Sequence, residues 1–185
     1  RRQRQMCIRD SNPRRPRVPD FRSINPAEVR DNPFRLIGED WMLVTAGTTR
    51  AWNTMTASWG GLGVLWSRPV AFAFIRPTRY TFGFVERSAR FSLCFFGEEW
   101  REALKFCGTR SGRDTDKAQA TGLAPVAGPA GAVIFEQARL ALICRKLHAQ
   151  DLDPARFVDP ALHDEYPEQD YHRVYVGEVE HCLAR

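Results

Sequence analysis

The sequence predicts a mainly β protein, built as an antiparallel barrel with a few inserted helices, and three observations support this class. Short apolar runs bounded by Gly, Pro and polar residues recur along the chain, as is typical of strands. No βαβ rhythm and no internal repeat is visible, which favours antiparallel pairing. A chain of 185 residues with 43% hydrophobic residues also suffices for one domain with a substantial core.

Four strands are predicted in the first half of the chain. They are expected at residues 42–47, 52–58, 70–75 and 91–96, where aliphatic, aromatic and threonine residues dominate. The link between the first two has the length of a hairpin turn. The third run lacks polar alternation, which indicates that both of its faces are covered. Ahead of these strands, residues 25–30 are expected to form a single helical turn.

Three helices are predicted between and after these strands. The clearest covers residues 98–106 and is expected to end at Gly108. Its apolar residues recur at the spacing of one helix face, and they are Trp100, Ala103, Leu104 and Cys107. A shorter helix is predicted over residues 79–85, with Thr78 as its N-cap. Another is expected to run from an Asp114 cap to Ala120.

The second half of the chain supplies the remaining predicted strands. They cover residues 133–136, 138–147 and 172–184. Residues 151–170 are rich in Pro and acidic groups, and this composition predicts a long loop with a turn or two. Gly177, inside the last strand, is expected at a bulge or at a point of close backbone approach.

The net charge of +5 is concentrated at the start of the chain. Residues 1–22 contain eight arginines and two aspartates, so the rest of the chain is close to neutral. One interpretation is an arm that contacts nucleic acid or another polyanion. The other, which we favour, is a leader that lies over a neighbouring subunit or stays disordered. We therefore divide the chain into a basic arm or leader at 1–33 and a domain at 34–185, with no nucleic-acid partner expected.

The cysteines and histidines indicate a reduced protein without a metal site. The five cysteines are an odd number and contain no CxxC pair, which predicts a cytoplasmic protein with mostly buried thiols. The four histidines show no metal-ligand spacing. No apolar run is long enough to cross a membrane, so no membrane contact is expected.

Residues 53–61 read Asn-Thr-Met-Thr-Ala-Ser-Trp-Gly-Gly, an unusual composition for a strand and its end. Strands generally avoid Asn and Gly. Glycine lets a flat ring approach the backbone closely, and the hydroxyls with nearby amides can satisfy a ligand rich in acceptors. The alternative is an ordinary strand end followed by a turn.

Arg79-Tyr80-Thr81 stands at the start of a predicted helix, about twenty residues further on. The first N–H groups of a helix are unpaired, and its dipole favours an anion. An arginine and a threonine hydroxyl at this position would complete a phosphate clamp. The alternative is that Thr78 only caps the helix and Arg79 lies in solvent.

Together these segments resemble the flavin reductase-like, FMN-binding split-barrel family. Further matching blocks follow in the family's order, namely residues 107–117, the aliphatic run that ends in Cys144, and residues 170–172 leading to 177–179. The resemblance covers about residues 34–184 and leaves out the arm. It implies that the mainly β fold is an antiparallel FMN-binding split β-barrel.

The resemblance also implies a set of FMN contacts. The phosphate and ribityl chain are expected at Arg79, Tyr80, Thr81, Thr54 and Thr56. The isoalloxazine ring is expected at Met55, Ala57, Ser58 and Trp59, and the further contacts are Asn53, Ser111, Arg113 and Lys117. The resemblance also implies a homodimer with the flavin near the subunit interface. The 108–117 block is then expected near the flavin, from the same subunit or its partner. Alternatively, that block is a solvated loop.

The function implied is that of an oxidoreductase, an NAD(P)H-dependent flavin reductase. NAD(P)H would donate a hydride to FMN, and the electrons would pass to a second flavin or another acceptor. The alternative is a flavoredoxin-like electron carrier or FMN-binding protein without nicotinamide activity. No catalytic side chain is predicted, because the flavin supplies the chemistry. His172 has two open interpretations, proton transfer or a structural role.

Overall fold

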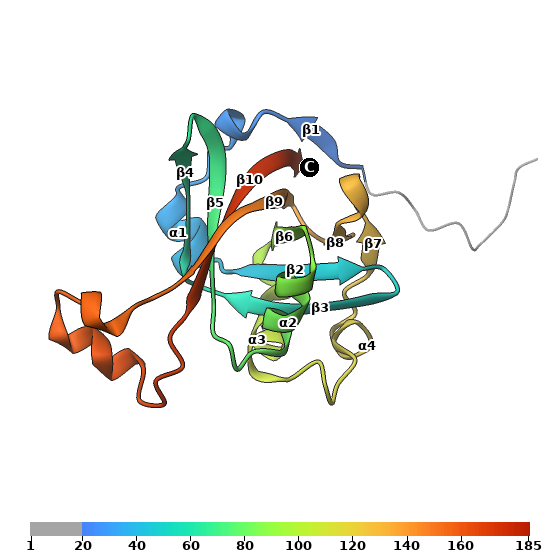
Figure 1. The fold of residues 1–185 in the computed structure, drawn as a ribbon. Helices are drawn as coiled ribbons and strands as arrows, with labels where there is room; N and C mark the ends of the chain where they lie inside the picture. The colour runs from blue at the N-terminus through green and yellow to red at the C-terminus, as the bar shows by residue number, and fades with distance from the viewer. Residues whose placement is uncertain (1–19) are drawn as a thin grey trace, which may run out of the picture.

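Most strands of the protein belong to one antiparallel sheet (Figure 1). A computed structural model describes residues 20–185. The strands there are β1 (Arg22–Ile24), β2 (Met42–Thr48), β3 (Ala51–Ala57), β4 (Gly60–Leu65), β5 (Arg68–Ile75), β6 (Arg90–Phe95), β7 (Pro125–Ala127), β8 (Val133–Phe135), β9 (Leu140–Asp151) and β10 (Arg173–Ala184). The main sheet has the order β3-β2-β6-β9-β10-β5-β4, β1 pairs with β10, and β7 and β8 form a separate hairpin.

The main sheet curls into a barrel but stays open between its edge strands, β3 and β4. At its centre, β10 pairs with β9 along one side, while β5 and β1 share the other side. The pairing of β10 with β9 shifts register between Val176 and Gly177. A Cβ atom on Gly177 would lie only 2.7 Å from Phe91 and Cys144, so the predicted bulge and close approach are confirmed.

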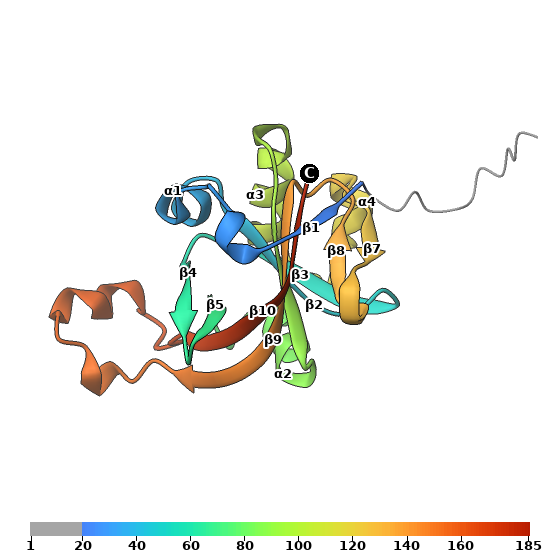
Figure 2. The ribbon, with the colours of Figure 1, turned by 90° about the horizontal axis from the view of Figure 1, so that it is seen from above.

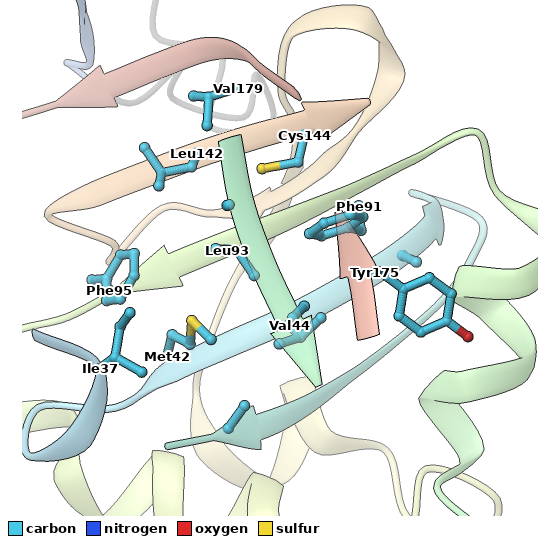
Figure 3. Close-up of a cluster of buried hydrophobic side chains, with 14 of the residues drawn as sticks. Ile37, Met42, Val44, Phe91, Leu93, Phe95, Leu142, Cys144, Tyr175 and Val179 are labelled. Atoms are coloured by element: carbon cyan, nitrogen blue, oxygen red, sulfur yellow. The ribbon is translucent and has the colours of Figure 1, made fainter. Parts of the chain in front are cut away.

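The central strands bury side chains on both faces. One face of β2, β6 and β9 points into the barrel interior (Figure 3), where Val44, Leu93 and Leu142 meet. The opposite face packs under the β7–β8 hairpin and the helices, with Leu43 and Ile143 as examples. Each large apolar side chain buried in this way stabilises the fold by about 1.5–3 kcal/mol. Burial on both faces explains why these runs lack polar alternation.

Four α-helices are present in the described residues. They are α1 (Pro33–Gly38), α2 (Tyr80–Arg87), α3 (Arg101–Thr109) and α4 (Lys117–Thr121). In Figure 2, α2 and α3 flank the β2–β3 hairpin. The apolar face predicted for the clearest helix is confirmed, because Leu104 and Cys107 of α3 are buried against the hydrophobic cluster outside the barrel.

Two predicted N-caps and one predicted helix end differ from the structure, and α3 begins at Arg101 after a 3-10 turn at Glu98–Trp100. Arg79, and not Thr78, is the N-cap of α2, because the Thr78 hydroxyl instead donates to Asp170 Oδ2 at 3.3 Å. Gly108 lies inside α3, which continues to Thr109. Asp116, and not Asp114, caps α4, since its carboxylate accepts a hydrogen bond from the Gln119 amide.

Two elements near the cavities described below were not predicted from the sequence. Helix α1 has a readable signal, since the Asn32 side chain accepts from the Phe34 amide and Pro33 opens the helix. Strand β4 contains three glycines in six residues, and this composition hides a strand. It forms because β5 offers it a full ladder of partners, from Gly60 opposite Ala73 to Leu65 opposite Arg68.

Residues 152–172, between β9 and β10, extend away from the barrel in Figures 1 and 2, and we call them the β9–β10 excursion. The excursion contains two 3-10 helices, η4 (Pro154–Arg156) and η5 (Pro160–Glu165), which agrees with the predicted loop with turns. Arg76 at the end of β5 anchors it, with one nitrogen 2.6 Å from Asp170 Oδ1 and another donating to the Glu165 carbonyl at 2.8 Å.

Part of the predicted arm lies outside the described residues, namely residues 1–19. The rest of it includes β1 and one 3-10 turn, η1 (Pro26–Glu28), which agrees with the helical turn predicted at 25–30. The division of the chain at residue 33 stays a prediction. The four cysteines of the described part are free and buried, and Cys7 lies outside it. Residues 20–185 contain no helix that could span a membrane and no cluster of metal-ligating side chains.

Candidate functional site

A cavity of about 220 Å³ lies where β3, β5, α2 and β10 approach one another. Its lining residues are Met55, Thr56, Ala57, Ser58, Trp59, Phe74, Arg76, Arg79 and His172. The cavity therefore brings two predicted ligands of the phosphate and ribityl chain, Thr56 and Arg79, together with the predicted ring contacts Met55, Ala57, Ser58 and Trp59. Phe74 and Arg76 were not predicted. Phe74 lies near the end of β5 and Arg76 directly follows it, and only the fold brings this strand end beside β3.

Two guanidinium groups line the cavity. Arg76 is paired with Asp170, whereas Arg79 donates to the Gly108 carbonyl at 2.9 Å. Within residues 20–185 no carboxylate forms an ion pair with Arg79. Arg79 also stands at the N-cap of the eight-residue helix α2 without a side-chain cap. The unneutralised guanidinium and the helix start give this end of the cavity a positive potential.

Three of the predicted ligands, Asn53, Thr54 and Thr81, are buried and do not line the cavity. The Asn53 amide donates to the Thr81 hydroxyl at 2.7 Å, which joins β3 to the first turn of α2. The Thr54 hydroxyl is 2.8 Å from that of Thr45 on β2 and also contacts a β2 carbonyl. In this structure these side chains hold the cavity wall in place.

Lys117 is also buried, with 6% of its surface exposed. Its ammonium donates to the Thr54 carbonyl at 2.7 Å and to the Cys107 carbonyl at 2.8 Å. Burial lowers the pKa of Lys117, the Cys107 thiol opposes this shift, and the charge of Arg79 adds to it. Lys117 therefore connects α4, α3 and β3 behind the cavity.

The remaining predicted ligands lie around the loop that precedes α4. The Arg113 guanidinium lies over the ring of Tyr80, 4.8 Å from its centroid. The Ser111 hydroxyl accepts from the Arg113 amide at 3.2 Å. The loop backbone packs closely on β3, since a Cβ on Gly112 would fall 1.9 Å from Asn53 Oδ1. The 108–117 block thus reaches the site region within its own chain.

Thr56 is the predicted ligand that both lines the cavity and forms a hydrogen bond to a neighbouring helix. It lines the cavity, yet its hydroxyl donates to the Leu104 carbonyl of α3. This bond joins α3 to β3 at a residue that lines the cavity. Thr56 therefore supports the cavity floor with its hydroxyl and forms part of that floor with its remaining atoms.

His172 is a buried member of the cavity, with 8% of its surface exposed. Its Nδ1 atom is 2.8 Å from the Tyr166 hydroxyl, and its ring centroid is 4.9 Å from that of Trp59. Burial lowers the pKa of His172 to about 4, with Arg76 and Arg79 adding to the shift and Asp170 opposing it. The imidazole is therefore neutral at pH 7 and offers a hydrogen-bonding group instead of a charge.

The comparisons with known proteins define the class. The model of the flavin reductase like domain family matches residues 34–185. The chain therefore belongs to the flavin reductase-like family, as the resemblance implied. No curated protein matches the sequence.

Solved structures of similar fold lead to the same class. An FMN-binding protein from Thermus thermophilus is 23% identical, with 88% of this chain and 77% of that one covered and a TM-score of 0.62. A flavoredoxin from Methanosarcina acetivorans is 20% identical, with coverages of 79% and 68% and a TM-score of 0.61. An NADH:FAD oxidoreductase from Streptomyces globisporus C-1027 is 17% identical, with coverages of 79% and 74% and a TM-score of 0.59. These similarities confirm the predicted split β-barrel fold.

Proposed function

We propose that this protein binds FMN in the 220 Å³ cavity and is an NAD(P)H-dependent flavin reductase that passes electrons to a second acceptor. One observation carries the proposal. The polar and aromatic stretch 55–59 and two arginines from another part of the chain line the same cavity. Apolar and aromatic side chains beside two guanidinium groups suit a planar ring that carries a phosphate.

The donor groups suit the phosphate of FMN. Arg79 is free of carboxylate partners among the described residues and stands at the first turn of α2. A phosphate there would receive guanidinium N–H bonds and the dipole of the helix start. Arg76, fixed by Asp170, would add charge without further ordering of its side chain.

The opposite part of the cavity suits the ring. Met55, Ala57 and Phe74 give it an apolar surface. Ser58 and Trp59 link β3 to β4 outside both strands, and Trp59 is 42% exposed. An indole of this exposure offers a face on which a second ring can stack. Main-chain amides at this link are suitable donors for the acceptors on the edge of a flavin.

When bound, FMN supplies the redox chemistry by accepting a hydride and later releasing electrons. The side chains have supporting tasks. Arg76 and Arg79 bind the anionic group, and Trp59 and Phe74 orient the ring. The neutral His172 provides a hydrogen-bonding nitrogen beside it. The sequence has no G-x-G-x-x-G motif, and a transient nicotinamide needs only an accessible ring face.

The proposal includes a homodimer in the cytoplasm. A volume of 220 Å³ is below the range of about 300–1,000 Å³ usual for small-molecule sites, so bound FMN would extend beyond these walls. A second subunit that covers the exposed part is the arrangement we propose. The four free, buried thiols of the described residues support a reducing location.

The first test is the purified protein itself. A yellow preparation that releases FMN on boiling is expected, and FMN is then identified by chromatography. Stopped-flow mixing with NADH or NADPH under anaerobic conditions should bleach the oxidised flavin band faster than with free FMN. A protein that neither retains nor binds added FMN would overturn the proposal.

A flavoredoxin-like electron carrier is the second candidate. It is favoured by the similarity to the flavoredoxin fold and needs the same cavity. The stopped-flow experiment separates the two functions. Bound FMN that bleaches with dithionite but only at the background rate with both nicotinamides would establish the carrier and exclude the reductase.

A further inference from the structure

A second, larger cavity adjoins the candidate site. Its volume is about 560 Å³, and it shares Ser58, Trp59 and Phe74 with the smaller cavity. Three other elements enclose it, namely α1, β4 and the β9–β10 excursion. The exposed indole of Trp59 thus stands between the two cavities. A molecule in the larger cavity would lie next to whatever occupies the smaller one.

The chemistry of this second cavity is different from that of the first. Aromatic and aliphatic side chains form most of it, including Ile37, Leu62, Phe157 and Leu162. Glu165 is the one charged residue among its lining, and no lysine or arginine is present there. A phosphate group would find no cationic partner and would face a carboxylate. The lining therefore selects against nucleotides and for uncharged, apolar ligands.

The wall supplied by the excursion is fixed in place by residues of the candidate site. The Arg76 guanidinium lies over the Tyr166 ring, 4.9 Å from its centroid, and bonds the Glu165 carbonyl. The Tyr166 hydroxyl is 2.8 Å from His172 Nδ1. The Phe157 ring also packs near the Tyr166 ring, with centroids 6.0 Å apart. The cavity is thus preformed, which reduces the entropy cost of binding.

We propose that this apolar cavity is a ligand site beside the flavin site and that it binds an uncharged, apolar ring compound. The inference rests on the proposed function. Nucleotide acceptors are excluded from this cavity by its lack of cations.

The test compares two probes of the same shape in isothermal titration calorimetry with the FMN-loaded full chain. One is 2-naphthol, which is uncharged at pH 7, and the other is 2-naphthoate, which carries a carboxylate. We expect 2-naphthol to bind at least about tenfold more tightly, because the cavity offers the carboxylate no partner. Equal affinities, or no binding of 2-naphthol, would overturn the proposal.

Two matched variants locate the binding. Leu162 lines the cavity and is 44% exposed, whereas Val158 lies in the same excursion, is 96% exposed and does not line it. Leu162→Arg should weaken 2-naphthol binding about tenfold by placing a charge in the apolar wall. Val158→Arg should leave it unchanged. Equal effects of the two variants would assign the binding to another surface.

The same titrations separate this inference from the proposed function. FMN affinity is measured for each variant and for the chain without flavin. Binding of 2-naphthol by a chain that fails to bind FMN would refute the proposed function and keep the apolar site. FMN binding without 2-naphthol binding would refute only the apolar site, and would indicate that another copy or segment fills it.

Discussion

The two ends of the segment 53–59 use similar residues for opposite purposes. At the first end, Asn53 and Thr54 are buried and bonded to α2 and β2. At the other end, Ser58 and Trp59 are exposed at the mouth of the cavity. The difference shows that the buried half holds the cavity wall in place, and that the other half exposes its side chains to the cavity. A rigid, internally bonded half is what allows the exposed half to keep one shape.

The largest effect is expected from replacing Lys117, whose ammonium binds the Thr54 carbonyl in the buried half of the segment. Lys117→Met should lower the free energy of unfolding by about 2–3 kcal/mol, since the Thr54 and Cys107 carbonyls lose their donor. Urea unfolding measures this change. Lys105→Met is the control, because Lys105 forms an exposed pair with Glu102 and should change stability by less than about 0.5 kcal/mol. Similar losses of stability in both variants would contradict the structural role of the buried Lys117.

Replacing Arg79, which lines the same cavity as Ser58 and Trp59, tests the exposed half of the segment. Arg79→Ala should weaken FMN binding by about 1.5–3 kcal/mol, which is roughly tenfold or more, while stability stays nearly constant. Fluorescence titration of FMN measures the affinity. Arg87→Ala, at the other end of the same helix, should bind FMN like the wild type. Unchanged FMN affinity in Arg79→Ala would remove Arg79 from the phosphate site.

An effect that develops only at acidic pH concerns His172, whose ring lies beside Trp59 of the exposed half. In the unfolded chain its imidazole is protonated below about pH 6.5, whereas the folded chain keeps it neutral down to about pH 4. Between these values the unfolded state binds more protons, so stability decreases as the pH falls, by up to about 1.4 kcal/mol per pH unit. His172→Gln should show a shallower decrease in unfolding experiments at pH 6.5, 5.5 and 4.5. Parallel curves for the variant and wild type would show that His172 does not contribute.

Much of the barrel could be predicted from the sequence, because its buried strands are apolar runs with clear ends. Strand β4 could not be predicted, since Gly60, Gly61 and Gly63 do not indicate a strand. It forms because β5 pairs with it along its length. Helix α1 could have been found from Asn32-Pro33, which is a readable helix start.

The candidate site could be predicted in part for a similar reason. The stretch 55–59 has a composition that a structural strand end does not need. Whether a polar residue faces a ligand or another element depends on tertiary packing, and this is why Asn53 and Thr81 could not be assigned a direction. Arg76 was missed because its partners, Glu165 and Asp170, are about ninety residues away in the chain.

The pairing of β10 has a consequence for the order in which the protein is made. Arg173 of β10 lies opposite Ile75 of β5, so the β4–β5 hairpin stays without its neighbour until synthesis has passed through nearly one hundred further residues. During that time the apolar run 70–75 presents an unpaired edge to the solvent, where it can pair with other chains. Nascent chains that stall before β10 are therefore expected to need chaperone protection on the ribosome.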